Sequence, residues 1–133
     1  MHIARFIDLE KGIVYSTVTG TITVAEVRAD MARLAAEPVY APDMPGIIDM
    51  CNATAGLSSD ELRQIAEVVK NSPKVVAHTR RALLVSTDLM FGLYRMFATF
   101  ASDGSMEYQI FRDKKPAYAW IEEIAERRRK LRS

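Results

Sequence analysis

Short apolar runs alternate with amphipathic segments along the chain, and this alternation predicts an α/β fold. Five runs rich in β-branched or aromatic residues are typical of strands; they cover 5–8, 13–18, 46–50, 81–86 and 108–111. Between and after them, four segments repeat apolar residues at helical spacing, beginning near residues 24, 59, 88 and 114. The first two runs flank the turn Glu10-Lys11-Gly12, so the chain is expected to open with a β-hairpin.

Capping and breaking residues set the predicted ends of the helices. Thr23 with Glu26, and Ser58 with Glu61, fit the capping box that begins a helix. Pro38 and Pro73 follow the ends of the first two helices, which a proline cannot continue. Strands that alternate with helices form right-handed βαβ units. The predicted fold is therefore a mixed five-stranded sheet with an N-terminal β-hairpin followed by βαβ units and four main helices, parallel except for the first strand.

Length and composition are those of one globular domain. The 133 residues are 49% hydrophobic and 26% charged, which predicts a single domain over residues 1–133 with a core of its own. No apolar run is long enough for a transmembrane segment, and the first residues do not resemble a signal peptide. The one cysteine, Cys51, excludes an internal disulfide framework. Together these features predict a cytoplasmic protein.

The charge is distributed unevenly along the chain. Of eighteen basic residues, five lie within 127–133, and the preceding residues carry thirteen basic against seventeen acidic side chains. A nucleic-acid-binding surface would intersperse basic residues with aromatic ones, so no nucleic acid is expected as a partner. Glu123 with Arg127, and Glu126 with Lys130, have the spacing of stabilising pairs on one helix. Residues 127–133 are therefore interpreted as a basic helical tail.

Residues that could carry catalysis or hold a metal are few. Cys51 and His78, with Asp49 to orient the imidazole, form the remote alternative of a cysteine-dependent enzyme. Cys51 ends an apolar strand, however, and His78 lies in a polar approach to the next strand. Two histidines, His2 and His78, fall short of the three or four ligands of a zinc site. No metal, no cofactor and no catalytic residue are predicted.

The segment 88–101 has more apolar surface than a helix on one side of a sheet needs. On a helical plot, one apolar face is formed by Leu89, Leu93, Met96 and Phe100, and the apolar arc is extended well beyond it by Met90, Phe91, Tyr94, Phe97 and Ala98. The candidate surface for a partner or ligand is Met90, Phe91, Tyr94 and Ala98. Such an excess indicates a second burial partner. Three partners are considered: the last helix through Tyr118 or Trp120, a second copy of the chain in a homodimer, or a small apolar or lipid-like ligand.

The pattern as a whole resembles the SpoIIAA-like group of STAS/SEC14-related domains. The residues that carry the resemblance are Gly20, Ile47-Ile48-Asp49, residues 81–86 and 92–97, Phe111-Arg112-Asp113, Ala117 and Trp120-Ile121. The resemblance implies a bacterial protein with the fold of anti-sigma-factor antagonists. It also implies a non-enzymatic binding or regulatory module that acts through protein–protein contacts, and its SEC14 side suggests a carrier of a lipid-like ligand as the alternative.

The same resemblance makes two serines candidates for a phosphorylation switch. In the antagonists a strand-ending aspartate is followed by a phosphorylatable serine at the start of the next helix, and Ser58 and Ser59 follow Asp49 in this way. Two acids come directly after them, Asp60 and Glu61, which departs from the pattern of the antagonists and would repel a phosphate. The competing interpretation is that Ser58 is simply the helix N-cap.

Ligands of open α/β sheets collect outside the carboxyl ends of the strands, where the helices begin. The residues expected at this crevice are Asp49, Cys51, Ser86, Thr87 and Lys115. Because three of the helices begin beside an acid, the local field should not favour phosphates. An uncharged ligand or a protein is therefore the expected occupant, rather than a nucleotide.

Overall fold

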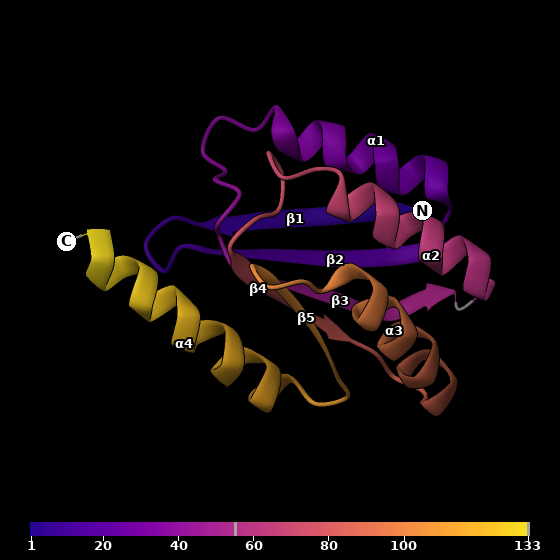
Figure 1. Cartoon of the computed structure of the whole chain (residues 1–133). Coiled ribbons are helices and arrows are strands. Elements are labelled where there is room, and N and C mark those ends of the chain that lie inside the picture. The colour runs from indigo at the N-terminus through magenta and orange to yellow at the C-terminus, as the bar shows by residue number, and fades with distance from the viewer. Residues whose placement is uncertain (55, 133) are drawn as a thin grey trace.

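The computed structural model describes residues 1–54 and 56–132 and contains one five-stranded sheet with four helices (Figure 1). The strands are β1 (His2–Asp8), β2 (Ile13–Thr21), β3 (Gly46–Thr54), β4 (Thr79–Leu84) and β5 (Met106–Phe111). The helices are α1 (Val24–Ala35), α2 (Ser59–Lys70), α3 (Asp88–Ala101) and α4 (Lys114–Arg132). The predicted succession of elements is thus confirmed.

The strands lie in the sheet in the order in which they follow one another along the chain. β1 pairs with β2 antiparallel, and the three remaining pairs, β2 with β3, β3 with β4 and β4 with β5, are parallel. The prediction of a mixed sheet with an antiparallel first strand is confirmed. Several strands extend beyond the apolar runs, because threonine and asparagine continue the pairing at 19–21 and 52–54.

Helices α1, α2 and α3 cover one face of the sheet, and α4 covers the other (Figure 1). Each of the first three connects neighbouring parallel strands that advance in the same direction, so right-handed crossovers place all three on the same side. α4 follows the last strand and is free of this constraint. The expectation that the last helix covers α3 through Tyr118 or Trp120 is therefore wrong, since both residues belong to the core of the opposite face.

α3 buries part of its apolar excess against α2 and the sheet. Its buried residues are Met90, Tyr94, Phe97 and Ala101, all within the large core of the α1–α3 face. Leu89 is exposed, and Leu93 and Phe100 pack only partly against that core. The stripe that faces the sheet thus includes residues that the helical plot placed beyond the first apolar face.

The basic residues at the end of α4 bind the rest of the chain. The predicted pairs Glu123–Arg127 and Glu126–Lys130 are present at 2.9 and 3.3 Å. Arg128 and Arg132 both reach the carboxylate of Asp43, at 3.0 and 3.3 Å, and Arg129 donates to the carbonyl of Lys11. This end of α4 is therefore fixed to the loop before β3 and to the β1–β2 turn. No helix of the described residues is long and apolar enough to cross a membrane.

Candidate functional site: a cavity between the sheet and helices α1–α3

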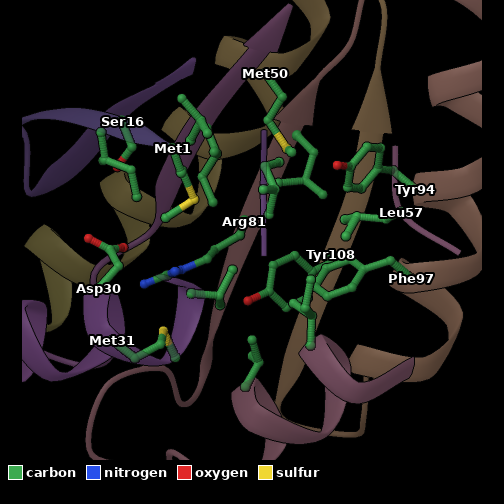
Figure 2. Close-up of a pocket in the computed structure, with 18 of the residues that line it drawn as sticks. Met1, Ser16, Asp30, Met31, Met50, Leu57, Arg81, Tyr94, Phe97 and Tyr108 are labelled. Carbon is green, nitrogen blue, oxygen red and sulfur yellow. The ribbon is translucent and has the colours of Figure 1, made fainter. Parts of the chain in front are cut away.

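A cavity of about 110 Å³ lies between the sheet and the three helices that cover its first face (Figure 2). Apolar side chains from strands and helices form most of its wall, among them Met1, Val18, Met31, Ile48, Met50, Leu57, Leu62, Ile65, Leu83 and Phe97. The polar side chains at its wall are Arg5, Ser16, Asp30, Arg81, Tyr94 and Tyr108. A ligand here would meet hydrocarbon on most sides and a few fixed polar groups, which is the usual composition of a small-molecule site.

Arg5 and Asp30 form the first polar group at this cavity. The guanidinium of Arg5 donates two hydrogen bonds, of 2.7 and 3.1 Å, to the carboxylate of Asp30, and its Nε donates to Ser16 Oγ at 3.2 Å. Arg33 approaches the same carboxylate from the outside at 3.5 Å. Because the Arg5 fork is bidentate, the charge of Asp30 is well compensated.

Arg81 is the second polar group, and it is buried. Only 7% of the residue is exposed. Its Nη2 donates to the hydroxyl of Tyr40 at 2.8 Å, and that hydroxyl in turn donates to the carbonyl of Val75. The phenol of Tyr108 faces the guanidinium: burial raises the pKa of Tyr108, and the charge of Arg81 partly opposes the rise. The Nε of Arg81 has no hydrogen-bond acceptor within the described part of the chain.

Tyr94 presents a hydroxyl to the cavity from α3. Figure 2 shows this hydroxyl directed into the cavity, while the side chain of Arg81 extends across it toward Asp30. The hydroxyl is buried and has no hydrogen-bond partner among the described residues. Burial raises the pKa of Tyr94 to about 12, so the phenol stays neutral and can donate. A buried hydroxyl without a partner is a group that a bound molecule could satisfy.

We expect Tyr94→Phe to raise the free energy of unfolding by about 1 kcal/mol, because it removes a buried hydroxyl that makes no hydrogen bond. Tyr40→Phe is the matched control, since the Tyr40 hydroxyl makes two hydrogen bonds and its loss should lower stability by about 1 kcal/mol. Urea unfolding of both variants measures the difference. A loss of stability in Tyr94→Phe equal to that in Tyr40→Phe would show that the Tyr94 hydroxyl is already satisfied.

The five residues predicted at the strand ends lie away from the cavity. Cys51 N–H donates to the carboxylate of Asp49 at 3.0 Å, and Ser86 Oγ donates to the Cys51 carbonyl at 3.0 Å. Thr87 caps α3 by accepting from the Met90 amide. Lys115 is exposed in the first turn of α4. The structure thus brings Asp49, Cys51 and Ser86 into contact, but their polar groups are used for local hydrogen bonds.

The geometry around Cys51 does not favour a nucleophile. Burial, followed by the hydrogen bond and charge of Asp49, raises the pKa of the Cys51 thiol, whereas a reactive cysteine needs a lowered one. Asp49 of β3 pairs with Leu84 of β4, and the same register continued by two residues places Cys51 opposite Ser86. His78 precedes that position by eight residues, which corresponds to about 26 Å along the strand. Within residues 1–54 and 56–132, no three metal-ligating side chains gather into a group that could hold an ion.

The four candidate residues on α3 divide between core and surface. Met90 and Tyr94 are buried by the chain itself, and Tyr94 lies at the wall of the cavity. Phe91 and Ala98 are half-buried and line a shallow groove between α3 and β5. Tyr94 is therefore placed to meet a ligand, whereas only Phe91 and Ala98 are accessible to a second subunit.

Ser58 is the N-cap of α2. Its hydroxyl accepts from the Glu61 amide at 3.2 Å, and the Glu61 carboxylate accepts from the Ser58 amide at 3.1 Å, which completes the predicted capping box. We expect Ser58→Ala to lower the free energy of unfolding by about 1 kcal/mol and Ser58→Asp to change it little, because aspartate also accepts from the helix amides. Ser59→Ala, one exposed position further on, is the control in chemical denaturation. Equal effects at the two serines would contradict the capping role.

Two of the charged residues at the cavity could have been found from the sequence. Arg81 lies two residues before Leu83, so the period of a strand places it on the same face as that core residue. Asp30 lies three residues after Val27 and four before Leu34, on the apolar side of α1. A charged residue in phase with the core residues of its element is the sequence signal that marks such a position.

Comparisons with known proteins support the fold and leave the activity open. A structure search finds an uncharacterised protein of the DUF3478 family from Shewanella loihica PV-4, described as having a SpoIIAA-like fold. It is 22% identical, with a TM-score of 0.60 over 90% of this chain and 93% of that one. Neither the family models nor the curated proteins yield a match. The chain thus has a SpoIIAA-like fold, and the resemblance seen in the sequence is confirmed at that level.

Proposed function

We propose that this protein is a non-enzymatic binding module whose ligand is a small, largely apolar molecule held in the cavity beneath α1–α3. The observation that carries the proposal is the cavity itself. Its wall is mainly hydrocarbon, and the hydroxyl of Tyr94, which has no hydrogen-bond partner in the described part of the chain, points into it. Protein interiors are normally packed without such space, and an apolar cavity of about 150 Å³ is known to hold benzene. A volume of about 110 Å³ suits a ligand of similar size.

The seven methionines allow a direct test of binding at this place. Met1, Met31 and Met50 line the cavity, whereas Met44, Met90, Met96 and Met106 do not. With ¹³C-labelled methionine methyl groups, benzene or butanol should shift the signals of Met31 and Met50 and leave that of Met96 unchanged. Shifts spread equally over all methionines, or none at millimolar probe, would contradict the proposal.

Mass spectrometry of the natively purified chain provides an independent measurement. A carrier is expected to retain a small molecule that denaturation releases. The variant Leu57→Phe adds volume at the cavity wall and should reduce both the retained molecule and the methyl shifts. Its control is Leu89→Phe, because Leu89 is exposed on α3 away from the cavity.

Regulation through protein contacts is the second function that we propose, on the strength of the SpoIIAA-like fold and of the exposed Ser58 and Ser59 at the start of α2. If Ser58 is a phosphorylation switch, Ser58→Asp imitates the phosphorylated serine and should abolish partner binding without changing the melting temperature. Phosphate on either serine in protein isolated from its native cell would support this function, and unmodified serines would contradict it.

The homodimer also stays a prediction, now restricted to the groove of Phe91 and Ala98. Phe91→Glu is expected to yield a smaller, folded species in sedimentation, because it places like charges across a two-fold contact. An unchanged mass, or a wild-type monomer at tens of micromolar, would end the dimer hypothesis. Tyr94 is not suitable for this test, since a charge there would disrupt the core.

A further inference from the structure

Arg81 is a buried cation whose charge the described chain balances only in part. The charge of Asp30 favours the charged form of Arg81, but the bidentate pair with Arg5 already occupies that carboxylate. No ion pair joins Arg81 to any acid within residues 1–54 and 56–132, and its Nε lacks an acceptor. Buried charges are normally paired, because an isolated one loses its hydration without compensation. The exception here lies at the wall of an apolar cavity.

Gly46 provides the space that the Arg81 side chain occupies. In the sheet Gly46 pairs with Arg81 on one side and with Val14 on the other. A Cβ added at Gly46 would lie 4.0 Å from Arg81 Nε and 3.3 Å from the Val14 carbonyl oxygen. Any longer side chain would therefore take the path of the guanidinium. The glycine allows the charged group to lie along the sheet at the wall of the cavity instead of turning toward solvent.

From this arrangement we infer that the ligand of the cavity is a small monocarboxylic acid, with its carboxylate paired to Arg81 and its hydrocarbon part against Met50, Leu57 and Phe97. The inference rests on the proposed binding function and names the class of ligand. A planar guanidinium fork matches a carboxylate geometrically, and the pair would supply the acceptor that Nε lacks. A monoanion would give Arg81 a direct ion pair, because the carboxylate of Asp30, whose charge reaches Arg81, is already bound by Arg5.

The volume limits the size of the acid. A cavity of about 150 Å³ holds benzene, which has six non-hydrogen atoms, so a cavity of about 110 Å³ accommodates roughly four to six. Propanoate and butanoate, with five and six non-hydrogen atoms, are within this range. The Tyr94 hydroxyl, which points into the same space, provides a second polar contact for a ligand with a further oxygen.

The test compares acids with neutral molecules of the same shape by calorimetry and methionine methyl shifts. The probe pairs are propanoate with propanamide and butanoate with butanamide. The wild-type chain is expected to bind each acid about 10- to 100-fold more tightly than its amide, as a charge-assisted hydrogen-bonded pair should provide. Arg81→Met should remove this preference and leave amide binding in place. Arg81→Lys keeps the charge without the planar fork and should retain part of the preference.

The outcomes separate this inference from the proposed function. Equal binding of acids and amides by the wild-type chain would overturn the assignment to Arg81 and leave the apolar site standing. Binding of neither kind would overturn both. Preference for acids that survives in Arg81→Met would place the anion elsewhere and overturn the inference, and circular dichroism establishes that each variant is folded before it is compared.

Discussion

Replacing Arg5 by methionine is expected to lower the free energy of unfolding by about 2 kcal/mol or more, whereas the same change at Arg81 should alter it by less than about 1 kcal/mol. Both arginines line the same cavity. Arg5→Met leaves the carboxylate of Asp30, whose side chain is 12% exposed, with the exposed Arg33 at 3.5 Å as its remaining ion pair. The charge of Arg81 also reaches Asp30 but forms no ion pair with it. Arg81→Met removes a buried charge that has no acid partner in the described chain, and Tyr40 keeps its hydrogen bond to Val75.

Chemical denaturation of the two variants and of the wild-type chain measures this contrast. Asp30→Asn is the control for Arg5→Met, because it removes the acid of the same pair and should also be destabilising, though by less. A loss of 2 kcal/mol or more in Arg81→Met would identify Arg81 as a structural residue whose interactions are complete. That result would also contradict the inference that the carboxylate of a ligand pairs with Arg81.

The fold was predictable because its elements follow local rules. Apolar runs of strand length, helix caps at Thr23 and Ser58, and right-handed crossovers are sufficient to predict a mixed sheet with its antiparallel first strand. The helix after the last strand was different. No crossover determines its side, so the expectation that it covers α3 had no local basis, and the structure places it on the opposite face.

The site was less predictable than the fold, because it is a cavity, and a cavity depends on how side chains from distant parts of the sequence pack together. The sequence pointed to Tyr94 as a residue with a second partner, and the structure places this residue at the cavity wall. It did not point to the space itself, which the side chains of the sheet and of helices α1–α3 leave unfilled. The crevice at the strand ends was expected from the behaviour of open α/β sheets, and there the polar groups of Asp49 and Ser86 are engaged in local contacts.

We expect Ile121→Ala to lower the free energy of unfolding by about 3 to 4 kcal/mol, the largest effect of any substitution considered. α4 covers its face of the sheet alone, and its buried residues are Ala117, Ile121 and Ala125. The two alanines let the helix approach the strands closely, which leaves Ile121, at 0% exposure, as the one large side chain among the three. Its truncation would create a void that no neighbouring helix can fill.

Leu131→Ala is the matched control on the same helix, because Leu131 is 88% exposed and its truncation should change stability by less than about 0.5 kcal/mol. Thermal and urea unfolding compare the two variants. Ile121 and the cavity lie on opposite faces of the sheet, so the folded Ile121→Ala variant should still show the methyl shifts of Met31 and Met50 when a probe is added. A loss below about 1 kcal/mol would mean that α4 is held chiefly by its ion pairs to Asp43, and Asp43→Ala would then be the more damaging change.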